Sequence, residues 1–212
     1  MSKTDDAQTW KMIHAERATI ADILATLTPD QWAAPSWCGG WSVRETAGHM
    51  VVGAEQTKGR FMKRMAANAF RFNTMMDRDA RSTGARPTAE LVDRLRARVG
   101  TTNGPPAPAM TMLGEIVVHG QDVCQPLGVV SDTKPEAIAA CLDMYKVASF
   151  PLGTKKRIAG LRLSAPDIGW SHGDGPEVSG PALALLVAIT GRAGGLDALG
   201  GDGLPTLRGR MT

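Results

Sequence analysis

Three ionisable side chains recur on one face of an otherwise apolar segment between Met110 and Gln125. Glu115 and His119 are four residues apart, so on a helix they lie one turn apart on the same face. Asp122 follows His119 by three residues and extends this polar stripe. The rest of the segment is rich in Val, Ile, Leu and Met, which indicates a helix buried on nearly all sides. Because an unpaired buried charge is costly, these groups need partners, and a divalent metal ion would satisfy both Glu115 and His119.

His49 is the candidate for a third ligand, because it falls in the second turn of another predicted helix, just after a capping box at 42–45. A hydrogen-bonded core histidine is the alternative. Two imidazoles and one carboxylate, from His49, Glu115 and His119, leave coordination positions open, as is typical of a catalytic metal site. Zinc is the first choice for this set, although iron(II) and other divalent ions also use it. Asp122 is then expected to orient His119 through its other ring nitrogen.

The elements that must position these residues are amphipathic helices. Apolar residues at spacings of three, four and seven predict helices over 6–27, 43–70, 87–99, 110–125 and 134–149. Residues 73–87 are interpreted as a polar connection, and the Pro- and Gly-rich stretch 100–108 cannot be helical. Several helices of this length form a bundle, in which metal sites come from side chains on facing helices. Residues 1–150 are therefore predicted to be a metal-binding helical bundle.

The pattern changes after Pro151. Strands are predicted at 157–164 and 168–171, a third strand begins near Val178, and a helix follows from Pro181 to Thr190. Residues 151–212 are too few to be expected to fold alone, so we predict a small α+β appendage. The fold class is therefore mainly α.

Composition excludes several classes of protein. The net charge is +3, with 43% hydrophobic and 21% charged residues, which is ordinary for a globular chain. No apolar run reaches the roughly 18–20 residues that span a bilayer, and the polar N-terminus is unlike a signal peptide, so a cytoplasmic protein without membrane contact is expected. Basic residues are densest from Lys58 to Arg81. We interpret them as a solvated face, because nucleic-acid binding would require aromatic platforms or a known motif beside the charge.

Cysteine usage gives no sign of a disulfide framework or a zinc finger, because Cys38, Cys124 and Cys141 are odd in number and lack C-x-x-C spacing. Cys124 and Cys141 fall in apolar helical segments and are expected to be small buried residues. Cys38 lies in a loop with no activating base adjacent in sequence, so it is not expected to be a nucleophile.

Four segments, in the same order, resemble the mycothiol-dependent maleylpyruvate isomerase family of actinobacteria, within the DinB-like metal-binding bundles. The most specific are W-C-G-G-W-S-V-R-E-T-A-G-H-M (Trp37 to Met50) and G-E-I-V-V-H-G-Q-D-V (Gly114 to Val123). The other two are Glu16 to Trp32, which resembles the opening helix and turn, and Gly173 to Arg192, which resembles the C-terminal domain of many members.

The resemblance implies a DinB-like four-helix bundle with a small α+β C-terminal appendage. It implies that His49, Glu115 and His119 hold the metal, and that the chain is an isomerase or S-transferase using mycothiol as its thiol cofactor. It also implies that Arg192 assists with the substrate, since a guanidinium suits a carboxylate. The alternative for Arg192 is a helix C-terminal residue that complements the helix dipole.

The expected partner is an electrophilic small molecule such as an unsaturated carboxylic acid, with a homodimer left open. A metal-activated thiolate could add to an electrophilic carbon either for transfer or for cis–trans isomerisation. The alternative function is a non-catalytic metal-binding stress-response or binding protein of DinB-like fold. A nucleic-acid-associated protein is the third and least supported interpretation.

Overall fold

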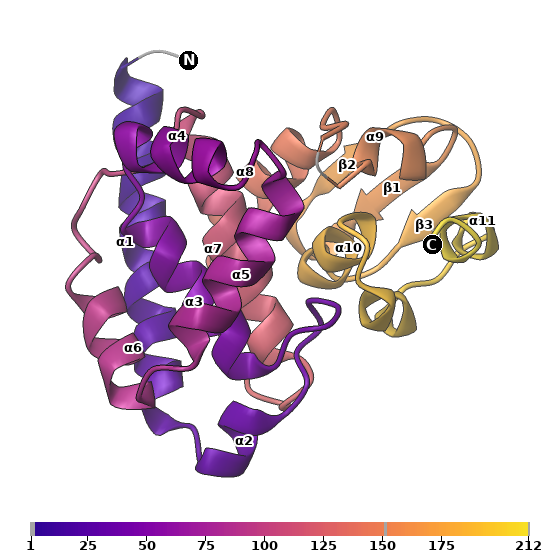
Figure 1. Ribbon diagram of the computed structural model, residues 1–212. Coiled ribbons are helices and arrows are strands. Elements are labelled where there is room, and N and C mark those ends of the chain that lie inside the picture. Colours follow the sequence, from indigo (N-terminus) through magenta and orange to yellow (C-terminus); the bar gives the residue numbers. More distant parts are fainter. Residues whose placement is uncertain (1–2, 151, 212) are drawn as a thin grey trace. The chain divides into compact units, whose positions relative to one another are not determined.

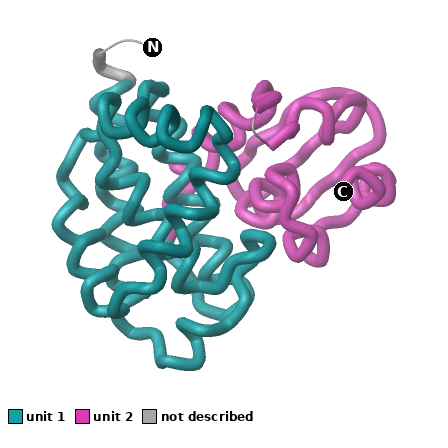
Figure 2. Tube along the Cα trace, viewed as in Figure 1, with its two compact units in different colours: residues 1–132 teal, residues 133–212 magenta. Residues whose placement is uncertain are grey.

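The structure is a computed structural model that describes residues 3–150 and 152–211. The chain folds into two compact units, residues 1–132 and 133–212 (Figure 2). The sequence predicted a domain boundary at residue 150, and the helix at 135–145, which groups with the second unit, accounts for the difference. A compact unit need not fold independently, so the domain boundary itself remains a prediction.

The first unit is helical. Its elements are α1 (Lys3–Thr26), α2 (Pro29–Ala33), α3 (Val43–Ala54), α4 (Lys58–Ala67), α5 (Phe72–Gly84), α6 (Thr88–Arg96) and α7 (Ala109–Cys124) (Figure 1). Helix α1 packs against α6 and α7, and α3 packs against α5, α6 and α7. The largest fully buried side chains of this unit are Ile13, Ile20, Leu24, Met75, Leu91, Leu95 and Leu113. The predicted mainly helical bundle is therefore confirmed.

Two glycines bring α3 and α5 into close contact. A Cβ atom on Gly48 would lie 2.5 Å from the backbone nitrogen of Gly84. A Cβ atom on Gly84 would in turn lie 2.8 Å from the carbonyl oxygen of Arg44. Because the obstructing atoms are backbone, no side-chain rotation could relieve such a clash. Helix α3 carries His49 next to Gly48. Its position against α5 therefore requires residues without side chains where the two helices cross.

The single helix predicted over 43–70 is wrong. Helix α3 ends at Ala54, and Thr57 caps a separate helix α4 by accepting a hydrogen bond from the backbone nitrogen of Arg60 at 3.2 Å. All residues of α4 are exposed or half-buried, and Met62 is 51% exposed. The apolar residues of α4 thus follow helical spacing without facing the core.

The polar connection predicted at 73–87 is also wrong, because this stretch forms α5. Its buried side consists mainly of short residues, Ala80, Thr83 and Gly84, with Met75 as the one large apolar side chain. A helix that packs through small residues carries little of the hydrophobic periodicity on which helix prediction depends.

The second unit combines helices with a small sheet. Its elements are α8 (Pro135–Tyr145), α9 (Thr154–Arg157), β1 (Arg162–Ala165), η1 (Pro166–Ile168), β2 (Trp170–His172), β3 (Glu177–Ser179), α10 (Ala182–Ile189), η2 (Ala193–Ala198) and α11 (Leu204–Arg208). The strand order is β2-β1-β3, with β2 antiparallel and β3 parallel to β1. The first strand begins at 162 instead of the predicted 157, because α9 and a turn occupy the intervening residues.

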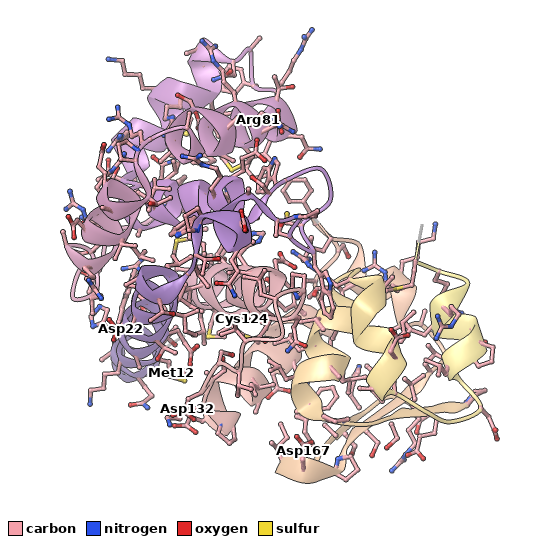
Figure 3. The ribbon with its side chains drawn as sticks, turned by 90° about the horizontal axis from the view of Figure 1, so that it is seen from below. Met12, Asp22, Arg81, Cys124, Asp132 and Asp167 are labelled. Atoms are coloured by element: carbon pink, nitrogen blue, oxygen red, sulfur yellow. The ribbon has the colours of Figure 1, made fainter. Side chains whose placement is uncertain are left out.

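Helix α10 packs against β1, α8 and η2, and Leu163, Val178, Leu185 and Leu186 form part of the core of this unit. Asp167, labelled in Figure 3, accepts hydrogen bonds from the backbone nitrogen of Ala182 at 3.0 and 3.1 Å and so satisfies the start of α10. The predicted small α+β C-terminal appendage is therefore confirmed. Along the described part of the chain, each helix is either too short or too polar to cross a membrane.

Candidate metal centre

His49 on α3 and Glu115 and His119 on α7, named here the donor triad, lie together within the first unit. One ligand atom from each lies within 4.8 Å of the other two. Nε2 of His49 is 2.8 Å from Oε2 of Glu115, and Nε2 of His119 is 3.6 Å from the same oxygen. The two imidazoles are nearly buried, whereas the Glu115 side chain is 38% exposed. Three donor atoms therefore converge at a point that solvent can reach from the Glu115 side.

Asp122 fixes the orientation of His119. Nδ1 of His119 donates to Oδ2 of Asp122 at 2.8 Å, and the Asp122 side chain is fully buried. With Nδ1 protonated, Nε2 carries the lone pair, and this is the nitrogen that faces Glu115. His49 differs, because its buried Nδ1 has no hydrogen-bond partner among the described residues. The two imidazoles are 4.7 Å apart between ring centroids and stand edge to face.

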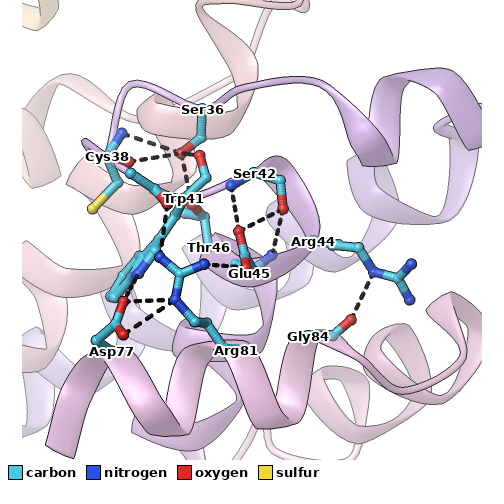
Figure 4. A network of polar contacts seen from close by, with 11 residues as sticks. Ser36, Cys38, Trp41, Ser42, Arg44, Glu45, Thr46, Asp77, Arg81 and Gly84 are labelled. Carbon is cyan, nitrogen blue, oxygen red and sulfur yellow. Dashed lines mark hydrogen bonds and ion pairs between the residues drawn. The ribbon is translucent and has the colours of Figure 1, made fainter. Parts of the chain in front are cut away.

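The indole of Trp41 packs against both imidazoles, with ring centroids 5.1 Å from His49 and 6.4 Å from His119. Its Nε1 donates to Oδ1 of Asp77 at 2.9 Å. The loop between α2 and α3 therefore supplies an aromatic wall to the donor triad. Asp77 on α5 accepts the hydrogen bond that fixes the Trp41 indole (Figure 4).

Trp41, Glu45, Asp77 and Arg81, named here the loop network, are joined by hydrogen bonds and ion pairs (Figure 4). Arg81 donates to Asp77 at 2.9 Å, to Glu45 at 2.9 Å and to the carbonyl oxygen of Gly40 at 3.0 Å. The hydrogen bond from Trp41, assisted by Arg81, holds the pKa of Asp77 below its usual value. Burial acts to raise the pKa of Glu45, but hydrogen bonds from Ser42 and the charge of Arg81 lower it.

Cys38 lies closer to a histidine than the sequence indicated. The ligand atoms of Cys38, His119 and Asp122 all lie within 4.8 Å of one another. In this second group the Asp122 carboxylate is fully buried and orients one imidazole, whereas in the donor triad two imidazole nitrogens face one partly exposed carboxylate, so the donor triad is the better candidate for a metal. The backbone nitrogen of Trp37 donates to the carbonyl oxygen of Asp122 at 2.9 Å, which ties the loop to α7. Cys124, labelled in Figure 3, is buried, and burial raises the pKa of its thiol to about 11.

A small cavity of about 20 Å³ adjoins the donor triad, and His49, Glu115, Met112 and Arg17 contribute to its lining. This volume holds about one water molecule. Met112 also lines a larger cleft of about 370 Å³ beside Trp10 and Lys58. Sequence reasoning did not select Arg17. The sequence did indicate that Arg17 is buried, because Arg17 occupies a position of the buried stripe of α1 that otherwise consists of Ile13, Ile20 and Leu24.

Arg192 follows α10 in the second unit and is 8% exposed. Its Nη1 donates to the carbonyl oxygen of Thr190 at 2.9 Å. Burial, with a further contribution from the charge of Arg192, lowers the pKa of Arg157. The buried Arg192 and the half-buried Arg157 therefore lie near one another in this unit, and the substrate contact of Arg192 stays a prediction.

Comparison with solved structures defines the class of the fold. The crystal structure of the mycothiol-dependent maleylpyruvate isomerase matches with a TM-score of 0.66 and 14% identity, over 95% of this chain and 96% of that one. A histidine-to-alanine mutant of a protein described by the same name matches with a TM-score of 0.65, 13% identity and the same coverage. At such identities the likeness shows the fold alone, a DinB-like helical bundle with a small C-terminal α+β region.

A family model matches part of the sequence. Residues 13–104 match the model of the mycothiol maleylpyruvate isomerase N-terminal domain. The resemblance inferred from the sequence is thereby confirmed, and the matched range includes His49 and the whole loop network. No curated protein matches the chain.

Proposed function

We propose that the donor triad binds a divalent metal ion, with zinc as the first choice, and that the chain is a mycothiol-dependent isomerase of an unsaturated small-molecule acid. The observation that carries this proposal is the convergence of ligand atoms from His49, Glu115 and His119 within 4.8 Å. The family of residues 13–104 and the fold shared with maleylpyruvate isomerase structures support it. An S-transferase that uses the same thiol is the nearest variant of this function.

The residues present fit such a metal ion. Two imidazole nitrogens and one carboxylate oxygen are a ligand set that zinc accepts while keeping a position open. Asp122 keeps the lone pair of His119 on the nitrogen that faces Glu115. A carboxylate that accepts from the second imidazole nitrogen also raises the basicity of the ligand. The donor set and its hydrogen-bonded support therefore favour a catalytic metal site.

A bound divalent cation would lower the pKa of the mycothiol thiol, giving the thiolate nucleophile that reversible addition to an unsaturated acid requires. The protein's own residues prepare this chemistry. Trp41 covers one side of the two imidazoles and excludes water from them. Glu115, at 38% exposure, leaves the other side accessible to ligands. We propose Arg192 as a substrate contact from the second unit.

Metal analysis of the purified protein tests the donor triad directly. We expect about one equivalent of zinc in the wild type and a loss of most of it in His49→Ala, Glu115→Gln and His119→Ala. His172→Ala is the matched control, because His172 lies on β2 in the second unit and should leave metal content unchanged. Full zinc occupancy in all three triad variants would falsify the ligand assignment.

The non-catalytic alternative is tested on the cobalt-substituted protein. If mycothiol reaches the metal, its addition should change the visible absorption spectrum of Co²⁺, because a thiolate ligand adds charge-transfer bands. An unchanged spectrum at saturating mycothiol, with the metal bound, would favour a metal-binding protein without thiol chemistry. Conversion of maleylpyruvate in the presence of mycothiol is the corresponding activity assay.

A further inference from the structure

Arg17 is a buried cation beside the donor triad. It is 2% exposed and lies within the buried stripe of α1, one helical turn from Ile13 and Ile20. A guanidinium stays charged at neutral pH, and burying a charge is costly unless an opposite charge lies near it. Arg64 shows the usual solution in this unit, since it pairs with the buried carboxylate of Asp79.

The contacts of Arg17 do not neutralise it. Its Nη1 donates to the carbonyl oxygens of Arg98 at 3.0 Å and Thr101 at 2.9 Å, and its guanidinium carbon lies 5.8 Å from the ring centroid of Trp10. Among the described residues, no carboxylate lies within ion-pair distance of it. Burial lowers the pKa of Arg17 to about 10, which still leaves it protonated at neutral pH.

The cavity next to the donor triad places this cation within reach of a ligand. Arg17, His49 and Glu115 line the same space of about 20 Å³, which is enough for a carboxylate oxygen. Met112 forms part of its wall and of the wall of the 370 Å³ cleft, which is of the size that small-molecule sites have. In that cleft the positive Lys58 is accompanied by the negative Asp6, and in the small cavity Arg17 shares the wall with Glu115, without an ion pair between them.

We propose that Arg17 is a further substrate-binding residue, whose guanidinium binds a carboxylate of the acid named in the proposed function next to the donor triad. A guanidinium presents a planar set of donors that matches the two oxygens of a carboxylate. The remainder of the acid would occupy the cleft beside Trp10 and Met112. This inference rests on the proposed function for its catalytic meaning, but the cation that would bind the anion is Arg17 of α1, which is not a member of the donor triad.

Charge balance supports an anion at this place. Glu115 is the negative group in the cavity, and a bound divalent cation would more than offset it. Arg17 then leaves the cavity positive on balance, which favours an anionic ligand. If Arg17 served only to hold residues 98–101 through its two carbonyl bonds, its replacement would lower stability, and the wild-type protein would have no specific affinity for carboxylates.

The test is the binding of maleate, measured by calorimetry at constant ionic strength, to the metal-free and the zinc-loaded protein. We expect wild-type protein to bind maleate in both forms and not to bind its uncharged dimethyl ester. Arg17→Gln should weaken maleate binding by at least about 10-fold, the effect of losing a charge-assisted hydrogen-bonded pair. Arg44→Gln is the matched control, because Arg44 also donates to backbone carbonyls but lies outside the cavity.

The outcomes separate this inference from the proposed function. If the wild-type protein does not bind zinc, the metal proposal is overturned. Maleate binding to the metal-free protein still tests the role of Arg17 in that case. Equal maleate affinity in Arg17→Gln and wild type, or equal binding of the ester, would overturn the anion site. If Arg17→Gln does not fold, nuclear magnetic resonance of the wild-type protein is the second measurement. The Nε–H resonance of Arg17, identified as the signal missing from Arg17→Lys, should shift when maleate is added. The absence of a shift would overturn the inference.

Discussion

The loop network and the donor triad share Trp41 but differ in how completely their polar atoms are paired. Arg81 reaches two carboxylates and a carbonyl oxygen, and Asp77 accepts from both Arg81 and Trp41. In the donor triad, Nδ1 of His49 has no partner among the described residues, and two imidazole nitrogens approach a single oxygen of Glu115.

Arg81 of the loop network and Arg17 beside the donor triad differ in the same way. Arg81 is half-exposed and neutralised by Asp77 and Glu45, whereas Arg17 is buried and has carbonyl groups and an indole as its partners among the described residues. Complete pairing is what a supporting scaffold requires, because every unmet buried polar group lowers stability. Incomplete pairing next to a cavity is what a ligand site requires. This difference in pairing therefore indicates that the loop network has a structural role and that the donor triad with Arg17 has a binding role.

The largest expected effect comes from the helix crossing on which both regions depend. Gly48→Ala should lower the free energy of unfolding by about 3 kcal/mol, because the added methyl group meets the backbone of Gly84. Metal affinity should fall with it, since His49 is the next residue. Gly53→Ala is the control, because a Cβ atom there has open space within 4 Å, and it should be neutral or slightly stabilising. Equal unfolding curves for the two variants would contradict this description of the crossing.

Asp122→Asn should reduce zinc affinity by about 10-fold, because the neutral side chain no longer stabilises the proton on Nδ1 of His119. Competition with a chromophoric chelator measures this change. The matched variant in the loop network, Asp77→Asn, should alter zinc affinity by less than about 3-fold, which is below the range for groups that support a ligand directly. A larger loss of zinc affinity in Asp77→Asn than in Asp122→Asn would contradict the distinction between the loop network and the donor triad.

Arg81→Gln should lower the free energy of unfolding by about 1 kcal/mol, since its bonds are several but its side chain is 49% exposed and screened by water. Zinc content should stay at the wild-type value. Arg86→Gln serves as control, because Arg86 forms one exposed pair with Glu90 and its loss should change stability by less than about 0.5 kcal/mol. Urea denaturation followed by circular dichroism measures both.

The smallest effect is a pH dependence at the far end of α3. A hydrogen bond from Arg94 holds the pKa of Glu55 below its usual value, although burial acts in the opposite direction. A lowered folded-state pKa stabilises the protein above the unfolded pKa of about 4.3, and this contribution is lost as the pH falls below it.

Glu55→Gln should therefore be less stable than wild type at pH 6 by about 0.5 kcal/mol, after allowance for solvent screening. The difference should shrink towards pH 3. A difference that grows on acidification would show that Glu55 has a raised pKa.

The sequence predicted the candidate site well where metal-ligating residue types fall within a segment of clear apolar periodicity. In α7, the i, i+4 and i, i+3 spacing put Glu115, His119 and Asp122 on one stripe, and the apolar surroundings defined the helix. His49 was chosen as the third ligand from its place on another predicted bundle helix, and the family resemblance then supported this choice. Ligand roles for these residues remain proposals.

What the sequence did not predict has physical reasons. Helix α5 packs through Ala80 and Gly84, so close backbone contact replaces the large apolar residues that mark a buried helix. The apolar residues of α4 follow helical spacing but face outward, so the pattern suggested a core helix that does not exist. Arg17 was passed over because a basic residue in an amphipathic helix is usually solvated, although its place in the Ile13, Ile20 and Leu24 stripe indicated burial.

Trp41 gives the protein an optical probe of its own site. Its indole lies against both histidines, and an imidazole that gains or loses a proton or a ligand changes the quenching of a neighbouring excited indole. The emission difference between the wild type and Trp41→Phe isolates this signal from the other four tryptophans. Titration of that difference would follow occupancy in solution without any added dye.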